Sequence, residues 1–227
     1  MIRALLAAAL LAFAVPAMAQ DSPPVAADAA AEAAEAVDTA DAVDTAAPVY
    51  ATQQVVLATA EGSIVLALEV ERAPVTAANF LRYVDQKRFD GVSFYRALRF
   101  PDRDDLGLLQ GGTQGDPKRV LPPVAHEPTT KTGLSHDDAA ISMARAAPGS
   151  AQGDFFIILG GLTSLDADPE KDGDNEGYAV FGHVVAGMDV VRRILESPVS
   201  ATEGEGSMRG QMLEKPVRIL SARRLGD

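Results

Sequence analysis

A permanently charged side chain stands among apolar ones in the segment FDGVSFYRALRF, residues 89–100. If this segment is a strand, counting by twos places Phe94, Arg96 and Leu98 on one face. A guanidinium cannot be neutralised in a protein, so a half-buried one is costly unless it finds a partner. A structural ion pair or a side chain that reaches solvent would explain Arg96, and so would a ligand-binding groove.

The residues around Arg96 favour the groove. Phe94 and Tyr95 precede it, Gln110 stands in the returning segment LLQGG, and the segment DFFI at 154–157 supplies two more rings. One guanidinium among apolar rings, with a single side-chain amide nearby, is typical of a site for an uncharged polar ligand.

Other kinds of catalytic chemistry find little support in the sequence. The three histidines have no second ligand type three or four residues away, so we expect no metal site; they are His126, His136 and His183. No Gly-x-Ser-x-Gly elbow indicates a serine hydrolase. The glycine-rich segment QGGTQGD lacks the lysine and the following helix of a phosphate-binding loop, and we expect no cofactor.

The acidic loop at 166–177 matches a calcium-binding loop only in part. Counted from Asp168, its acidic residues and Gly173 have the required spacing. The closing position falls on Ala179, which cannot bind a cation. We therefore interpret the segment as a solvated surface loop.

Short apolar strands must position these residues. Alternating apolar residues predict strands, and helical spacing predicts helices at 72–89, with Val75, Phe80 and Val84 on its apolar stripe, and at 186–198. The expected strands lie within 53–70 (two strands), 92–98, 106–112, 139–145, 154–161, 178–185 and 215–225. The segment PDRDD and the stretch from Gly112 to Thr132 are expected to be loops. About eight short strands and two well-separated helices predict a closed β-barrel capped at its ends.

Several ordered blocks of the sequence resemble those of a cyclophilin-type peptidyl-prolyl cis-trans isomerase. They are VSFYRAL, LLQGGTQGDP, ISMARAAPGSAQGDFFI, SLDADP and YAVFGHVVAGMDVV. They appear in the family's order from about Val55 to Val191, and the last strand fits as well. The resemblance implies a mainly β fold, a closed eight-stranded antiparallel β-barrel with an α-helix over each end, and an active groove on its outer surface.

The resemblance also implies roles for individual residues. Arg96 matches the catalytic arginine, Gln110 the glutamine of the groove, and Phe156 the phenylalanine that floors the proline pocket. Ala144 and Arg145 match the pair that contacts the backbone of the residue before proline. The remaining matched positions line the pocket or its rim: Leu165, Leu108 and Tyr178.

Several positions depart from the family pattern. Asp154 replaces the glutamine before the two phenylalanines, and Ser164 replaces the tryptophan associated with cyclosporin binding. Tyr178 replaces the histidine of the pocket rim, and the segment 101–107 replaces a tighter one that carries an aromatic residue. We expect turnover of small prolyl peptides to survive these changes and cyclosporin binding to be weak.

The first 19 residues have the layout of a secretory signal peptide. One basic residue (Arg3) precedes an apolar run from Ala4 to Val15, and Ala-Met-Ala ends at Ala19. The run is shorter than the roughly 20 residues of a membrane span, so we expect cleavage after Ala19 and no membrane span in the mature protein. Similar exported cyclophilins occur in Gram-negative bacteria, which implies a periplasmic location.

An acidic, alanine-rich segment at residues 20–49 follows, and we expect it to be a disordered tether. The leader contributes one positive charge and the tether seven negative charges, which leaves −6 of the chain's −12 for residues 50–227. This balance disfavours a nucleic-acid partner, because binding phosphates requires clustered Lys and Arg. Residues 50–227 are enough for one isomerase domain, which we expect to be a monomer.

These observations predict an isomerase that assists the folding of exported proteins and acts on proline-containing polypeptide clients. The expected mechanism is an arginine-assisted twist of the X-Pro bond in an apolar groove. An alternative is a chaperone or scaffold module that binds proline-containing segments with little turnover. The altered positions Asp154, Tyr178 and 101–107 favour this alternative. A third possibility is that the acidic tether recruits a basic partner.

Overall fold

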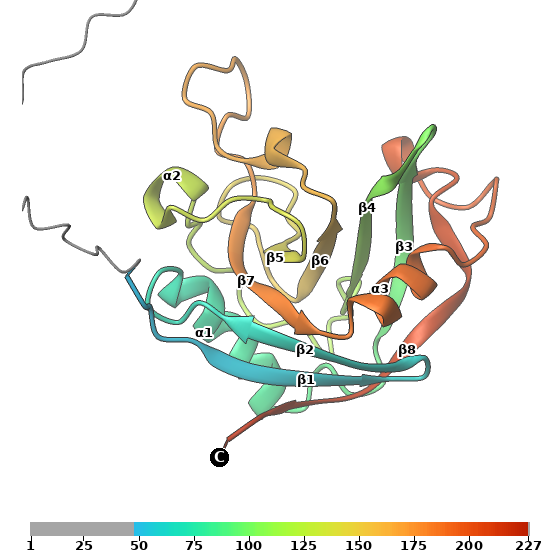
Figure 1. The fold of residues 1–227 in the computed structure, drawn as a ribbon, viewed down its shortest axis with the longest axis horizontal. Coiled ribbons are helices and arrows are strands. Elements are labelled where there is room, and N and C mark those ends of the chain that lie inside the picture. The colour runs from blue at the N-terminus through green and yellow to red at the C-terminus, as the bar shows by residue number, and fades with distance from the viewer. Residues whose placement is uncertain (1–47, 227) are drawn as a thin grey trace, which may run out of the picture. The chain divides into compact units, whose positions relative to one another are not determined.

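In the computed structural model the protein is described over residues 48–226, so the expected leader and nearly all of the expected tether lie outside the described residues. Eight antiparallel strands close into a barrel in the order β1-β2-β7-β5-β6-β4-β3-β8, and β8 returns to pair with β1 (Figure 1). The strands are β1 (Gln53–Thr59), β2 (Gly62–Leu68), β3 (Ser93–Phe100), β4 (Arg103–Gly112), β5 (Ala140–Met143), β6 (Asp154–Leu159), β7 (Ala179–Ala186) and β8 (Met212–Arg224). The predicted fold class is confirmed.

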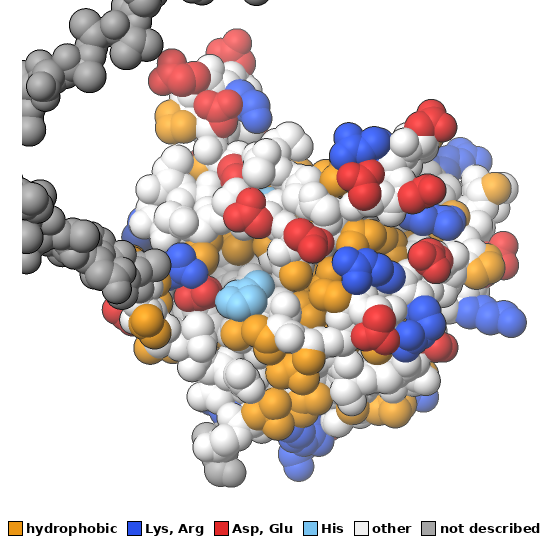
Figure 2. Space-filling view, viewed as in Figure 1, with side chains coloured by type: hydrophobic (Ala, Val, Ile, Leu, Met, Phe, Trp, Pro, Cys, Tyr) orange, Lys and Arg blue, Asp and Glu red, His pale blue; other side chains and the backbone are white. Residues whose placement is uncertain are grey.

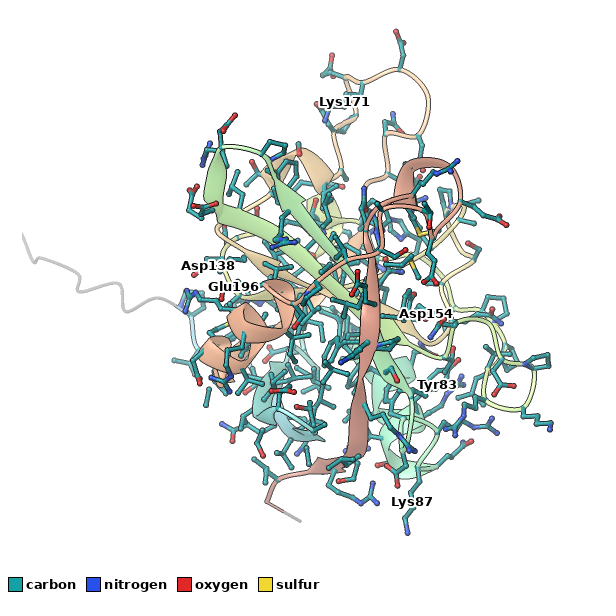
Figure 3. The ribbon with its side chains drawn as sticks, turned by 90° about the vertical axis from the view of Figure 1, so that its right-hand side faces the viewer. Tyr83, Lys87, Asp138, Asp154, Lys171 and Glu196 are labelled. Atoms are coloured by element: carbon teal, nitrogen blue, oxygen red, sulfur yellow. The ribbon has the colours of Figure 1, made fainter. Side chains whose placement is uncertain are left out.

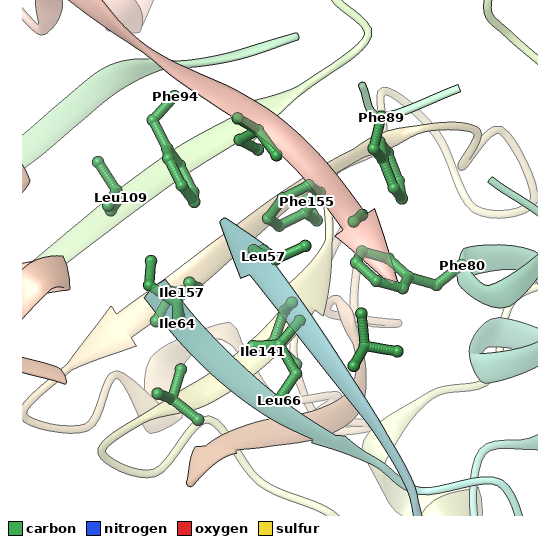
Figure 4. Close-up of a cluster of buried hydrophobic side chains, with 14 of the residues drawn as sticks. Leu57, Ile64, Leu66, Phe80, Phe89, Phe94, Leu109, Ile141, Phe155 and Ile157 are labelled. Carbon is green, nitrogen blue, oxygen red and sulfur yellow. The ribbon is translucent and has the colours of Figure 1, made fainter. Parts of the chain in front are cut away.

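The interior of the barrel is filled by alternate side chains of the strands together with rings from α1 and the segment after it (Figure 4). Phe155 lies among three other rings, with centroid distances of 5.3 Å to Phe80, 5.6 Å to Phe89 and 5.8 Å to Phe94. All three contacts are edge-to-face, which is a favoured arrangement of aromatic rings. This cluster fixes β3, β6 and α1 relative to one another.

Two helices cover the barrel, as predicted, and a third is a single short turn. Helix α1 (Pro74–Asp85) packs against β7 and β8, and α3 (Met188–Leu195) packs against β2, β3 and β4. The four-residue α2 (Thr129–Thr132) lies in the stretch predicted to be loop. The expected stripe of α1 is wrong at Val75, whose exposed fraction is 38%, because the first turn presents Thr76 to the interior instead.

The second hairpin of the chain is longer than predicted. The polar segment PDRDD was expected to be a loop, but β3 and β4 remain paired as far as Phe100 and Arg103. Only residues 101–102 form the turn, where Asp102 adopts a positive φ of 62°. An Asp tolerates this left-handed backbone better than most residues, which explains how a polar segment closes a tight hairpin.

Within residues 48–226, no helix has the length and apolar character needed to cross a bilayer.

The N-terminus of α1 is capped by a residue from a distant loop. Ala73 precedes the helix and has no side-chain acceptor for the free N–H groups of the first turn. The carboxylate of Glu127, only 1% exposed, accepts hydrogen bonds from the Val75 N–H (3.3 Å), the Thr76 N–H (2.8 Å) and the Thr76 hydroxyl (2.7 Å). Glu127 therefore supplies the missing cap, and its charge is favourable at the positive end of the helix dipole.

We expect Glu127→Gln to lower the free energy of unfolding by about 1–3 kcal/mol. The amide NH2 group of Gln would replace an acceptor oxygen and would face the buried N–H and O–H donors of the first turn. Chemical denaturation of residues 48–227 measures the loss. The matched control is Glu214→Gln, which changes an exposed glutamate on β8 and should leave stability unchanged. Equal stability of the two variants would show that Glu127 does not cap the helix.

Candidate active-site cleft

A cleft of about 920 Å³ lies on the outer side of the barrel over β3, β4 and β6. Side chains from the β3–β4 hairpin, from the segments that follow β5 and β6, and from the segment before β8 line it. All eight residues that the sequence assigned to a binding site line this cleft: Arg96, Leu108, Gln110, Ala144, Arg145, Phe156, Leu165 and Tyr178. The structure brings together residues that are up to 82 positions apart, from Arg96 to Tyr178.

Arg96 reaches the cleft because of an irregularity in β3. The pairing of β3 with both β4 and β8 shifts between Phe94 and Arg96, so Tyr95 and Arg96 both line the cleft. Phe94 and Ala97 on either side face the barrel core. The expectation that Phe94, Arg96 and Leu98 share one face is therefore wrong at Phe94, since a β-bulge changes the alternation of a strand.

The partner strand supplies a local reason for this bulge. While β3 advances from Phe94 to Arg96, its partner on β8 changes from Val217 to Met212. Pro216 lies in the skipped stretch and has no N–H to donate to a ladder. The break in pairing therefore coincides with a residue that cannot pair.

The guanidinium of Arg96 is held by two neutral amides. Its Nη1 donates to Oε1 of Gln110 and its Nε donates to Oε1 of Gln211, each at 2.8 Å. Neither partner carries a charge, so the positive charge of Arg96 is oriented without being compensated. Burial lowers the pKa of Arg96 from its ordinary value, although an arginine remains charged. Gln211 is not among the residues predicted from the sequence, because it lies 115 residues away and outside the family blocks.

Gln110 is in turn fixed by two further residues. Its Nε2 donates to the Tyr95 hydroxyl at 2.7 Å, and that hydroxyl donates to Oδ1 of Asp154 at 3.2 Å. In the series Arg96, Gln110, Tyr95, Asp154, each residue thus donates a hydrogen bond to the next. We call this series the relay. Figure 3 shows Asp154 beside the strands that carry the other members. The relay orients the Gln110 amide so that its oxygen faces Arg96.

Asp154 also accepts a hydrogen bond from the Gln114 N–H at 2.8 Å. Burial raises the pKa of this carboxyl above its ordinary value. Burial and the Asp154 charge raise the pKa of the Tyr95 phenol, so Tyr95 remains a donor at neutral pH. Asp154 departs from the family pattern, and its place at the end of the hydrogen bonds that lead to Arg96 could not be predicted from the sequence.

The apolar part of the cleft is floored by Phe156, which is only 3% exposed. Leu108 belongs to the same buried cluster, and Ala144, Leu165 and Tyr178 pack against it. The Tyr178 ring stands edge-on to Phe156 at a centroid distance of 5.4 Å. The result is a slot with an aromatic floor, one aromatic wall and aliphatic sides.

A Ser-His-Asp arrangement lies directly beneath this floor. His136 stacks on Phe156 at 5.9 Å, its Nδ1 is 2.6 Å from Oδ1 of Asp166, and its Nε2 is 3.0 Å from the Ser142 hydroxyl. His136 and Ser142 are both 0% exposed, so no substrate can reach the hydroxyl. Burial lowers the pKa of His136, which favours the neutral ring. We interpret the arrangement as support for the Phe156 ring.

Arg145 holds a loop with its side chain. Its guanidinium donates to both carboxylate oxygens of Asp174, at 2.6 and 2.9 Å, and to the Gly177 carbonyl. It also lies 5.0 Å from the centroid of the Tyr178 ring. The acidic loop at 166–177 is thereby fastened to the rim of the cleft. The expected backbone contact of Ala144 and Arg145 with a ligand stays a prediction.

Charged side chains of both signs gather on the acidic loop and on the tip of the β3–β4 hairpin (Figure 2). Lys171 lies at the outer end of the loop (Figure 3). Within the described residues, no group of three or more His, Asp or Glu side chains is arranged to hold a metal ion.

Comparisons with known proteins agree with this architecture. The family described as "Cyclophilin type peptidyl-prolyl cis-trans isomerase/CLD" matches residues 54–224. The peptidyl-prolyl cis-trans isomerase cyp18 of Streptomyces antibioticus is 36% identical over 75% of this chain and 97% of its own length. Peptidyl-prolyl cis-trans isomerase A of Dickeya dadantii is 36% identical over 74% of this chain and 83% of its own.

Among solved structures, a cyclophilin-type peptidyl-prolyl cis-trans isomerase of Cryptosporidium parvum superposes with a TM-score of 0.61 at 18% identity, covering 78% of this chain and 99% of its own. That structural match supports the fold. The sequence matches show the family, and the chain belongs to the cyclophilin-type peptidyl-prolyl cis-trans isomerases. It is therefore an enzyme that interconverts the cis and trans forms of X-Pro bonds.

Because Asp154 ends the relay, we expect its replacement to lower activity without lowering stability. Because burial raises the pKa of Asp154, folding favours the protonated acid, and the ionised form costs stability above that pKa. We expect Asp154→Asn to be at least as stable as the parent at pH 7. Its kcat/KM should fall about two- to tenfold, because a neutral amide oxygen accepts the Tyr95 hydrogen bond more weakly than a carboxylate does.

The pH dependence tests the same residue. In the parent, kcat/KM should decline as the pH falls through the raised pKa of Asp154, beginning above the ordinary value of about 3.9. The profile of Asp154→Asn should be flat in that range, measured by NMR exchange on a prolyl peptide. A variant that keeps the decline would assign it to another group, such as the buried His136, whose pKa is lowered by burial.

Proposed function

We propose that this isomerase accelerates slow prolyl steps in the folding of exported proteins and that Arg96 lowers the barrier to rotation. The observation that carries the proposal is the guanidinium of Arg96, half-buried beside the Phe156 slot and held by two neutral amides. Because these partners are neutral, the positive charge of Arg96 is still available to interact with a ligand.

The reaction itself explains why such a group is sufficient. An X-Pro bond passes through a twisted state about 18–20 kcal/mol above its planar forms. Twisting breaks amide resonance, so the proline nitrogen becomes pyramidal and gains a lone pair. A guanidinium N–H directed at this nitrogen binds the twisted state more strongly than either planar state, which is the condition for catalysis.

The surrounding side chains favour this interaction in two ways. Phe156, Leu108 and Leu165 hold the pyrrolidine ring while the preceding carbonyl swings. The apolar walls also exclude water, so a hydrogen bond from Arg96 is stronger than it would be in solvent. Gln110 and Gln211 limit the motion of the guanidinium and so reduce the reorganisation needed in the twisted state.

We expect Arg96→Ala to reduce kcat/KM at least tenfold, about 1.4 kcal/mol of transition-state stabilisation, while the domain stays folded. Arg96→Lys should fail as well, because an ammonium lacks the planar fork that engages both amides. The rates are measured by NMR exchange on a short prolyl peptide, with thermal unfolding of each variant as a check on folding.

The matched control is Arg99→Ala. Arg99 lies three residues further along β3, is exposed, and does not line the cleft. Its replacement should leave the rate unchanged. Equal rates for the parent and Arg96→Ala would remove Arg96 from the mechanism. A parent with negligible turnover but measurable peptide affinity would favour the binding-module alternative.

The location of the enzyme rests on the leader. The pattern of residues 1–19 supports export to the periplasm, where the domain would meet its clients as a monomer. We expect the chain expressed in a Gram-negative host to appear in the periplasmic fraction with Gln20 as its first residue, identified by mass spectrometry. Removal of residues 2–19 should retain it in the cytoplasm. A periplasmic product without the leader would refute its role.

A further inference from the structure

The cleft continues past Arg96 onto a second apolar surface that the sequence did not predict. Four partly buried side chains form it: Leu98, Phe100, Met208 and Met212. We call this surface the shelf. It lies at the Arg96 end of the cleft, whereas Ala144 belongs to the segment after β5 at the other end.

The hairpin side of the shelf is rigidly supported. Leu98 pairs with Leu108 on β4, and Phe100 pairs with Arg103 just before the turn. Gly107 in the same hairpin packs so closely on α3 that a Cβ there would lie 2.4 Å from Cδ2 of Leu195. A side chain at this position would have to displace Leu195, so Gly107 lets the extended hairpin pack closely on α3.

The other side of the shelf is fixed to Arg96 itself. Met208 ends a 3₁₀ turn at Gly206–Met208. The Gln211 side chain donates to the Ser207 carbonyl at 2.7 Å while it accepts the bond from Arg96, and the Gln211 carbonyl accepts from the Ala97 N–H at 2.8 Å. One residue therefore positions both the guanidinium and the turn that carries Met208.

The order of the strands gives the shelf a direction relative to the substrate. Ala144 follows β5, Phe156 is on β6, Gln110 on β4, Arg96 on β3 and Met212 on β8, and these five strands are consecutive neighbours. If the client residue before proline lies by Ala144 and the proline lies over Phe156, the client polypeptide crosses β4 and β3 after the proline. The shelf then lies under the residues that follow.

The spacing of the strands indicates which residue of the client reaches the shelf. Neighbouring strands are about 4.8 Å apart, so β3 lies about 10 Å from β6 across the cleft. An extended chain advances about 3.3 Å per residue, which brings the second or third residue after proline to the shelf. Methionine side chains adapt to different apolar partners, so the shelf suits both aromatic and large aliphatic groups.

We propose that the shelf is a specificity site for a large apolar side chain at the second or third residue after the proline of the client. The inference rests on the proposed function for the placing of the proline over Phe156 and of the preceding residue by Ala144. The shelf is built from the extended hairpin and the segment before β8, so it gives this chain a preference that the proline slot alone does not supply.

The test compares short prolyl peptides that differ at one position. Each carries Phe, Leu or Ser at the second or third residue after proline, or at the second residue before it as a reference. Both Kd and the catalysed exchange rate are measured by NMR. We expect Phe or Leu at one of the two later positions to improve Kd about tenfold over Ser, the lower end of what one small apolar group contributes in a hydrophobic pocket. The reference position should show a smaller ratio.

Variants assign the preference to the shelf. The double variant Phe100→Ser, Met208→Ser should bring the Kd ratio close to one, and Met208→Leu should keep it. The matched control is Val185→Ser, which changes an apolar residue on β7 that is 46% exposed and outside the cleft. Thermal unfolding confirms that each variant is folded.

The two proposals fail in different ways. Equal Kd for the Phe and Ser peptides, or a ratio that survives the double variant, would overturn the shelf while the exchange rates still support the isomerase. Absence of catalysed exchange with the Kd ratio intact would overturn the proposed mechanism and leave the shelf as a binding site.

Discussion

The bond pair that holds the Arg96 guanidinium is the constraint on which the cleft depends. Two amide oxygens orient a full positive charge without neutralising it, and each amide is itself fixed by a further contact. A carboxylate in either place would hold the side chain equally well but would compete with a ligand for its charge. The neutral partners therefore reconcile a rigid guanidinium with an available one.

Around this group, the protein assigns stability and chemistry to opposite sides of the same strands. The inward face of β3 and β6 presents Phe94 and Phe155 to the aromatic core, and the outward face presents Arg96 and Phe156 to the cleft. Adjacent residues thus serve unrelated purposes. The core fixes the backbone, and the fixed backbone determines the face from which each cleft side chain projects.

Sequence patterns were sufficient for the barrel, because alternation and helical spacing depend on neighbours along the chain. The eight cleft residues also followed from sequence, through ordered blocks rather than from any single motif. What could not be foreseen involves partners far apart in the chain. The bulge before Arg96 coincides with Pro216 on another strand, the cap of α1 comes from Glu127, and Gln211 meets Arg96 across 115 positions. No local propensity encodes such contacts.

Closure of the barrel has a consequence for how clients are held. Within residues 48–226 each of the eight strands has a partner on both sides, so the barrel offers an extended polypeptide little strand edge beyond the outer end of the β3–β4 hairpin. Adhesion to a client must come from side chains in one groove, not from a long ladder of backbone bonds. Such an attachment involves only a few residues of the client, and a client with exposed β-segments finds little strand edge on the barrel to which it could add.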